Sequence, residues 1–341
     1  MNRKLLATFV ASTTLISSLF GNPLINKAKN SGLVPVPKSQ SELLKLIDNP
    51  KNPITTEKVA LGKQLFFDPR LSKSGFISCN SCHNLALGGV DGIAAAVGHK
   101  WTVNPHHLNS PTVYNAVFMD RQFWDGRDPD LEKQAQGPIQ AGPEMAATKE
   151  HVVNTVSSIP EYVASFKAAY GQDVVVNFEK VTDTIATFER TLVTSSAYDD
   201  FLHGDSDALT DEEQKGLNLF IDKGCVSCHN NIALGGSMQA FAITGEYTYA
   251  DVGDFKGDEN GLVKVPTLRN IGQTAPYFHN GAVSTLKEAI TEMGRIQLGL
   301  TLNNKEVASI ETFLQSLSAT HEFSYPQLPD STISTPKPNL N

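Results

Sequence analysis

Cysteine is scarce in this chain, with only four among 341 residues. All four belong to two short motifs, so none remains for a disulfide, a structural zinc site or a thiolate nucleophile. Beyond the N-terminal segment there is no long apolar run that would span a bilayer. Basic residues are also in deficit, with 28 Lys and Arg against 36 Asp and Glu, and the net charge of −8 argues against nucleic-acid binding.

The four cysteines form two copies of the pentapeptide Cys-x-x-Cys-His. The copies consist of Cys79, Cys82 and His83, and of Cys225, Cys228 and His229. Two thiols three positions apart lie on one helical turn, so each can add to a vinyl group of a haem, and the next histidine can bind the iron. A redox dithiol or a zinc site would leave both histidines unexplained. The sequence therefore predicts two covalently bound c-type haems.

The N-terminus resembles an export signal. Asn2, Arg3 and Lys4 precede the apolar stretch from Leu5 to Phe20, which is short and rich in Ser and Thr. We expect residues 1–28 to be a signal peptide and the mature protein to be periplasmic. No clean Ala-x-Ala site follows, so the cleavage position stays open, and an uncleaved membrane anchor is the alternative.

An internal repeat organises the rest of the chain. Gly62–Asp68 leads into the first motif as Gly216–Asp222 leads into the second, and a Gly-Gly pair follows each histidine at a similar distance. We expect an all-α fold of two cytochrome c-like domains, related by duplication, with one haem in each. The predicted boundaries are 29–195 for the N-terminal domain, 196–321 for the C-terminal domain and 322–341 for an extended tail.

Helix signals dominate the intervals between the motifs, and strand signals are sparse. Apolar residues recur at helical spacing over Phe178–Val193 and Val307–Leu317, which we interpret as core packing. The predicted helix starts are a capping box of Thr210 with Glu213, the cap-plus-proline pairs Ser110–Pro111 and Asp128–Pro129, and N-caps at Ser284 and Asn303.

The function of each haem depends on its sixth ligand, because an open iron can bind a small oxidant while a fully ligated iron only transfers electrons. For the second haem, Met293 is the candidate, near the end of the helix predicted after Ser284. For the first haem, His99 is the nearest following histidine and lies in a glycine-containing loop. His106 and His107 have comparable spacing, so spacing alone leaves these three open.

Longer motifs resemble the bacterial dihaem cytochrome c peroxidases. They are Phe123–Arg127, Gly137–Met145 and Ala275–His279, and the resemblance extends from about Thr56 to Leu317. It implies that hydrogen peroxide is reduced to water at the N-terminal haem. It also implies that electrons enter at the C-terminal haem from a small periplasmic cytochrome c or a blue copper protein. Members of the family are often dimers, so a homodimer is an option, although the sequence shows no interface signal.

The resemblance implies roles for single residues near the first haem. Glu144 matches an acid that moves the peroxide proton. Gln134 matches a pocket glutamine, and Trp124 matches a tryptophan between the haems. His99 falls where the family has a resting ligand of the first iron, which would leave when the second haem is reduced.

Other implied roles concern the region between the domains. His279 matches a residue that hydrogen-bonds a haem propionate, and Met293 matches the second haem's methionine ligand. Asn109, Thr274 and Pro276 fall at the ligand positions of a calcium ion held mainly by carbonyl oxygens and waters. The segment from residue 104 to 108 is longer than usual by about two residues relative to the family.

Two other functional classes remain as alternatives. A related oxidase modifies a protein substrate through its two haems, and it carries a tyrosine where this chain has Met293. A pure electron-transfer dihaem cytochrome would keep both irons fully ligated in every redox state.

Overall fold

The computed structural model describes residues 22–320 and 323–341. This part of the chain is mostly helical, with one antiparallel pair of three-residue strands in which Met238 lies opposite Lys264. The α-helices are α1 Pro23–Asn30, α2 Gln40–Ile47, α3 Thr56–Phe67, α4 Cys79–Cys82, α5 Leu131–Gln134, α6 Gln136–Gln140, α7 Lys149–Ser157, α8 Pro160–Tyr170, α9 Phe178–Glu189, α10 Ala197–Leu202, α11 Asp211–Asp222, α12 Leu286–Leu298 and α13 Asn304–Gln315. The strands are β1 Met238–Ala240 and β2 Leu262–Lys264.

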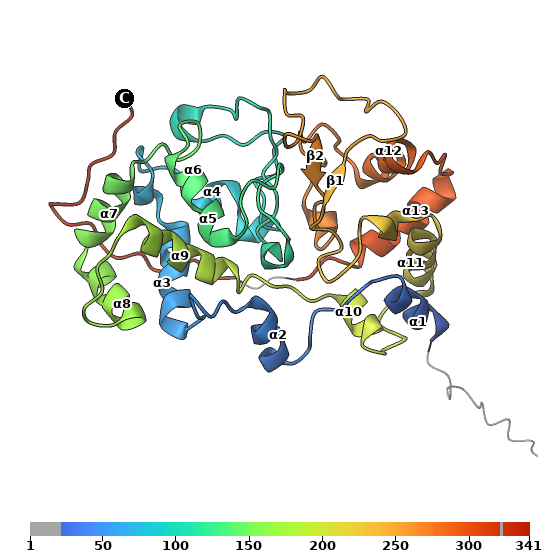
Figure 1. Ribbon diagram of the computed structural model, residues 1–341, viewed down its shortest axis with the longest axis horizontal. Coiled ribbons are helices and arrows are strands. Elements are labelled where there is room, and N and C mark those ends of the chain that lie inside the picture. The colour runs from blue at the N-terminus through green and yellow to red at the C-terminus, as the bar shows by residue number, and fades with distance from the viewer. Residues whose placement is uncertain (1–21, 321–322) are drawn as a thin grey trace, which may run out of the picture.

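The helices form two halves that lie side by side (Figure 1). In one half, α3 packs against α9, and in the other, α11 packs against α13. Helices α3 and α11 each lead into one of the two cysteine motifs. Each motif is therefore supported by an equivalent pair of packed helices, α3 with α9 and α11 with α13. The mostly helical structure with two cysteine pairs agrees with two cytochrome c domains.

A glycine lies at the crossing point of each helix pair. A Cβ atom on Gly62 would collide with the carbonyl oxygen of Thr184, and one on Gly216 would collide with the carbonyl oxygen of Ser309. These glycines occupy equivalent positions in the internal repeat, so the repeated sequence is repeated in the packing as well. The close approach of the two backbones is the reason that the helix interior has glycine there, despite its low helix propensity.

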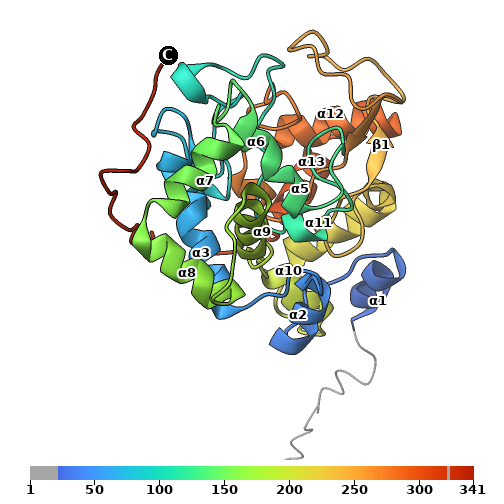
Figure 2. The ribbon, with the colours of Figure 1, turned by 60° about the vertical axis from the view of Figure 1, so that its left-hand side comes forward.

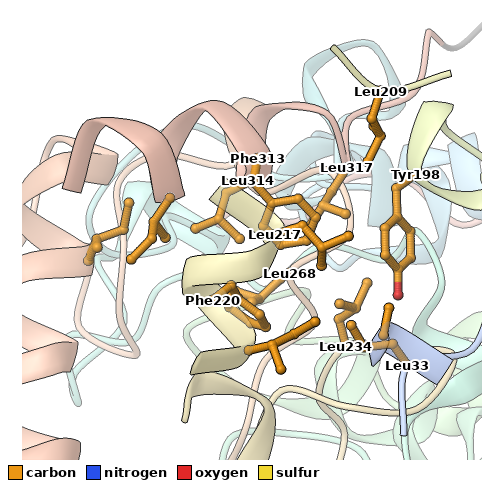
Figure 3. Close-up of a cluster of buried hydrophobic side chains, with 14 of the residues drawn as sticks. Leu33, Tyr198, Leu209, Leu217, Phe220, Leu234, Leu268, Phe313, Leu314 and Leu317 are labelled. Atoms are coloured by element: carbon orange, nitrogen blue, oxygen red, sulfur yellow. The ribbon is translucent and has the colours of Figure 1, made fainter. Parts of the chain in front are cut away.

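Each half has its own hydrophobic core. The core of the second half, shown in Figure 3, brings together α11, α13 and the segments around them. Its labelled members are Leu33, Tyr198, Leu209, Leu217, Phe220, Leu234, Leu268, Phe313, Leu314 and Leu317. The core of the first half is formed by residues of α3, α7, α8 and α9, and it confirms that the Phe178–Val193 stripe packs inward. The Val307–Leu317 stripe packs inward in the same way.

The two ends of the described chain each pack on the half that is distant in sequence. Helix α1 lies on the second half, where Ile25 and Ala28 join its core and Lys27 Nζ donates to Asn218 Oδ1 at 2.7 Å. Residues 323–341 run in an extended conformation along the first half, beside α7 and α8 (Figure 2). Both ends of the described chain therefore connect the two halves.

Two of the predicted helix starts are confirmed. Thr210 and Glu213 form the expected capping box of α11, and Asn303 caps α13 by accepting hydrogen bonds from Lys305 N and Glu306 N. The prediction of Ser284 is wrong by one residue, because Thr285 caps α12.

The two cap-plus-proline predictions are wrong. No helix begins at Ser110–Pro111, where the hydroxyl of Ser110 donates to Asp91 instead of capping. Helix α5 begins two residues later than Asp128–Pro129 predicts, since the carbonyl of Asp128 is bound by Gln122 N and Asp130 supplies the cap. At both sites, a hydrogen bond to a residue outside the expected helix takes the group that would have started it.

None of the helices in the described ranges combines the length and apolar character needed to cross a bilayer. Most of the segment predicted as an export signal, residues 1–21, lies outside the described residues.

Candidate active site

Each cysteine motif forms one tight turn. The first is α4, where the backbone N–H of Ser78 donates to Ser81 Oγ at 3.0 Å and fixes the start of the turn. The second is a 3₁₀ turn that follows Gly224, whose φ of 85° lies in the left-handed region. All four cysteines are unpaired thiols. Both pairs are therefore chemically available for attachment of a group within their half.

The two motif histidines have the same second interaction. The ring Nδ1–H of His83 donates to the carbonyl oxygen of Pro111 at 3.0 Å, and that of His229 donates to the carbonyl oxygen of Leu234 at 3.0 Å. Burial lowers the pKa of both histidines, which favours the neutral imidazole. A neutral ring whose Nδ1 is occupied presents Nε2 as a metal ligand.

Each motif opens into a cavity. The space not filled by protein atoms, including the part open to solvent, is about 1380 Å³ in the first cavity and about 1220 Å³ in the second. Cys82 and His83 line the first, and Cys225, Cys228 and His229 line the second. Free thiols, a neutral imidazole and largely apolar walls are the donor set and surroundings that a covalently attached haem requires. The residues present therefore fit one haem c in each cavity.

The first cavity brings together Glu144 and Gln134 with His83. Burial raises the pKa of the Glu144 carboxyl, and the positive charge of Arg127 opposes this shift. Arg127 itself lies over the ring of Phe123, 3.4 Å from the ring centroid. Glu144 thus retains a proton to higher pH than an exposed glutamate, which suits a group that must both accept and return one.

Trp124 lies between the two cavities and lines both of them. Its side chain is buried, and its indole Nε1–H donates to the carbonyl oxygen of Asn109 at 2.9 Å. Trp124 is thus part of the wall that the two cavities share.

His99 is buried but does not line the first cavity. Its backbone N–H donates to the carbonyl oxygen of Glu144 at 2.6 Å, and its ring Nδ1 has no hydrogen-bond partner among the described residues. The next two residues, Lys100 and Trp101, have φ values of 58° and 57°. Left-handed backbone at two consecutive non-glycine residues is strained, so this loop is held by its neighbours rather than by its own preference.

The other two candidate histidines lie further along the same region. His106 Nδ1 is 2.8 Å from Asp254 Oδ1, in an exposed contact between the two halves. Neither His106 nor His107 lines the first cavity.

Met293 and His229 line the second cavity together. Met293 is on α12, eight residues after the cap residue Thr285. His279 lines the same cavity and is buried, which lowers its pKa to about 4. Its ring Nδ1 has no hydrogen-bond partner in the described part of the chain.

Asn109, Thr274 and Pro276 line the first cavity near the junction of the halves. The backbone N–H of Asn109 donates to the carbonyl oxygen of His279 at 2.8 Å, so the two segments are directly joined. Within the described ranges, no cluster of three or more His, Cys, Asp or Glu side chains is arranged to hold a metal ion.

Sequence reasoning missed two buried charged residues that line these cavities. Glu189 lines the first, and its Oε2 atom has no partner among the residues that the structure describes. Lys264 lines both. Lys264 stands in an apolar stretch, between Val263 and Val265, and a charge within such a run is a signal that could have found it. Glu189 is followed directly by Arg190, so the sequence offers no such signal for it.

Comparison with known proteins gives consistent results. The family model described as "Di-haem cytochrome c peroxidase" matches residues 56–207. A cytochrome c551 peroxidase of Nitrosomonas europaea is 48% identical, covering 84% of this chain and 87% of the relative. One of Pseudomonas aeruginosa is 43% identical, covering 89% of each. A crystal structure of a MauG-like protein associated with microbial copper homeostasis has a TM-score of 0.71 and 27% identity, covering 80% of this chain and 92% of that one.

With this similarity across most of its length, the chain belongs to the di-haem cytochrome c peroxidase family.

Proposed function

We propose that this chain is a cytochrome c peroxidase that reduces hydrogen peroxide to water in the periplasm, using electrons from a small electron-transfer protein. The family membership supports the activity. The observation that carries the reaction site is the grouping of Glu144 and Gln134 with His83 in the first cavity. The second cavity contains His229 and Met293, with no acidic side chain in its wall, which suits electron transfer rather than peroxide chemistry.

When bound, the haem at His83 supplies an iron that coordinates peroxide, and the haem at His229 supplies a store for a second electron. Two electrons and two protons convert one peroxide molecule into two waters. Glu144 takes the proton from the oxygen nearer the iron and returns it to the departing oxygen, so its own proton balance is zero. The two protons that are consumed come from solvent. Gln134 orients the peroxide by hydrogen bonding through its side-chain amide.

Other residues act on electron flow and on access. Trp124, which lines both cavities, carries electrons from the second haem to the first. Met293, together with His229, would hold the C-terminal haem, and its thioether would raise the reduction potential of that haem. His99 would act as a gate that holds the first haem in the resting oxidised enzyme and leaves it on reduction. The strained backbone of its loop supports such a role. A loop that is kept in a strained conformation by its neighbours can change conformation when those neighbours move.

A calcium ion at Asn109, Thr274 and Pro276 stabilises the junction between the halves. Carbonyl oxygens and waters are ligands that calcium accepts. This location would connect the ion directly to the wall of the first cavity.

Export and maturation also form part of the proposal. The N-terminal segment acts as the export signal, and cleavage takes place before Ile25, which is earlier than the boundary at residue 28. The reason is that Ile25 and Ala28 are buried in the second core, so removing them would expose apolar surface.

The direct test is steady-state kinetics of the mature holoenzyme. Hydrogen peroxide should oxidise a reduced small cytochrome c with a stoichiometry of two cytochromes per peroxide, and a reduced blue copper protein serves as the competing donor. The donor that gives the higher kcat/KM is the better candidate for the natural partner. If peroxide oxidises neither donor while both haems are present and reducible, the peroxidase assignment is wrong.

A further inference from the structure

Lys264 occupies the junction of the two cavities. It is the last residue of β2, lies opposite Met238 in the strand pair, and its backbone N–H donates to the carbonyl oxygen of Trp124 at 2.7 Å. The residues that line both cavities are Trp124, Lys264, Pro266, Ile271, Tyr277 and Phe278. Lys264 is the only one of these described residues whose side chain is a cation.

The charge of Lys264 is buried without compensation. The residue is 6% exposed, and its ammonium makes no hydrogen bond or ion pair with any described residue. Asp125 is the acidic group whose charge acts on it, and Asp125 is already paired with Arg127 at 2.9 Å. Burial lowers the pKa of Lys264 to about 8, as expected for an amine that lacks a counter-ion. A buried unpaired cation is costly, so an anion entering from the cavities would offset part of that cost.

A covalently attached haem brings such an anion, because each haem c carries propionate carboxylates that the thioether bonds leave free. The nearby His279 offers a second unpartnered donor position in the second cavity, 6.3 Å from the Trp124 ring between centroids. We propose that Lys264 is a shared propionate-binding residue that holds a carboxylate of each haem at the boundary between the two cavities. This inference rests on the two haems of the proposed function and not on peroxide reduction.

A shared cation has a consequence for both haems. A positive charge close to an iron centre favours the reduced state, since reduction adds an electron. Lys264 therefore raises the reduction potentials of both haems together. It also fixes the edges of the two macrocycles against the segment that carries Trp124, so it acts as a positioning residue for electron transfer between them.

The test compares three variants of the full-length holoenzyme by redox titration followed spectroscopically, with haem content measured in parallel. K264Q removes the charge and should shift the potentials of both haems downward, whereas K264R keeps the charge and should restore both toward the wild-type values. K223Q is the control, because Lys223 lines only the second cavity and is already paired with Glu306. K223Q should leave the N-terminal haem potential unchanged.

Three results would overturn the inference. They are unchanged potentials in K264Q, a shift of one haem alone, and an equal shift of both haems in K223Q. If K264Q does not mature with haem, resonance Raman spectra of K264R decide: the propionate bending bands of both haems should differ from wild type, and unchanged bands would refute the contact. Shifted potentials in an enzyme without peroxide turnover would support Lys264 while refuting the proposed function, so the two failures are distinguishable.

Discussion

The backbone N–H of Lys264 donates to the carbonyl oxygen of Trp124 at 2.7 Å, and both residues line both cavities. Trp124 belongs to the first half of the chain and Lys264 to the strand pair of the second half. The contact that joins the halves is therefore also the wall that separates the two candidate haem sites. A change at one candidate haem site that moves this wall also changes the shape of the other site. The contact between Trp124 and Lys264 is therefore a direct physical route for coupling between the two sites.

Replacing Glu144 with glutamine tests the acid–base role. The amide keeps the size of the side chain but can neither accept nor return a proton, so we expect peroxidase turnover to fall by about 100-fold or more. The measurement is kcat/KM for peroxide with a reduced cytochrome c as donor. Haem content and the potential of the C-terminal haem should stay at wild-type values. Retained turnover in E144Q would remove Glu144 from the mechanism.

Replacing Met293 with leucine tests the ligand of the second iron. Leucine fills a similar volume without a sulfur atom, so the fold should tolerate it while the thioether ligand is lost. We expect the spectrum of a methionine-ligated haem to disappear from the reduced protein and the potential of that haem to fall. An unchanged reduced spectrum in M293L would mean that another residue binds the second iron.

The glycine at the crossing of α11 and α13 predicts a stability effect. In G216A the new Cβ would meet the carbonyl of Ser309, so the helices must separate, and we expect a loss of about 1–3 kcal/mol in the free energy of unfolding. Chemical denaturation measures it. G142A is a control for adding a methyl group outside the helices, because Gly142 lies in a turn and nothing lies within 4 Å of a Cβ there. Equal stability of G216A and G142A would show that the close crossing is absent.

Glu189 predicts a pH dependence of stability. Burial raises its pKa from 4.5 to about 8, so between these values the folded state binds a proton that the unfolded state has released. Wild-type stability attributable to this group should therefore decline as pH rises through that window, by roughly 1.4 kcal/mol per pH unit at most. E189Q lacks the titrating group, so its unfolding free energy relative to wild type should increase from pH 5 to pH 8. Parallel curves for the two proteins would contradict a raised pKa.

The sequence predicts the parts of this molecule whose chemistry is local. The two Cys-x-x-Cys-His motifs, the Thr210–Glu213 and Asn303 caps and the inward stripe of α9 depend on residues within a few positions of one another, and the structure agrees with them. The helix starts predicted at Ser110–Pro111 and Asp128–Pro129 are wrong. Ser110 is hydrogen-bonded to Asp91 and Asp128 to Gln122, and these bonds hold the backbone in a non-helical conformation.

Long-range relationships are the part that the sequence does not provide. The packing of α1 on the second half and of residues 323–341 on the first depends on contacts between segments far apart in the chain. The same holds for Lys264 and Glu189, whose importance comes from burial beside a cavity rather than from a motif. The convergence of Glu144, Gln134 and His83 on one cavity follows the resemblance, but only the folded chain brings them together.

The proposed function requires that the two irons differ, with one bound by both His229 and Met293 and the other able to release a ligand and admit peroxide. Absorption and electron paramagnetic resonance spectra of the holoenzyme, recorded in the oxidised and one-electron-reduced states with calcium present, test it most directly. We expect a methionine-ligated reduced C-terminal haem together with an N-terminal haem that becomes five-coordinate or water-bound. Two haems that both stay fully ligated by protein in the half-reduced state would contradict it.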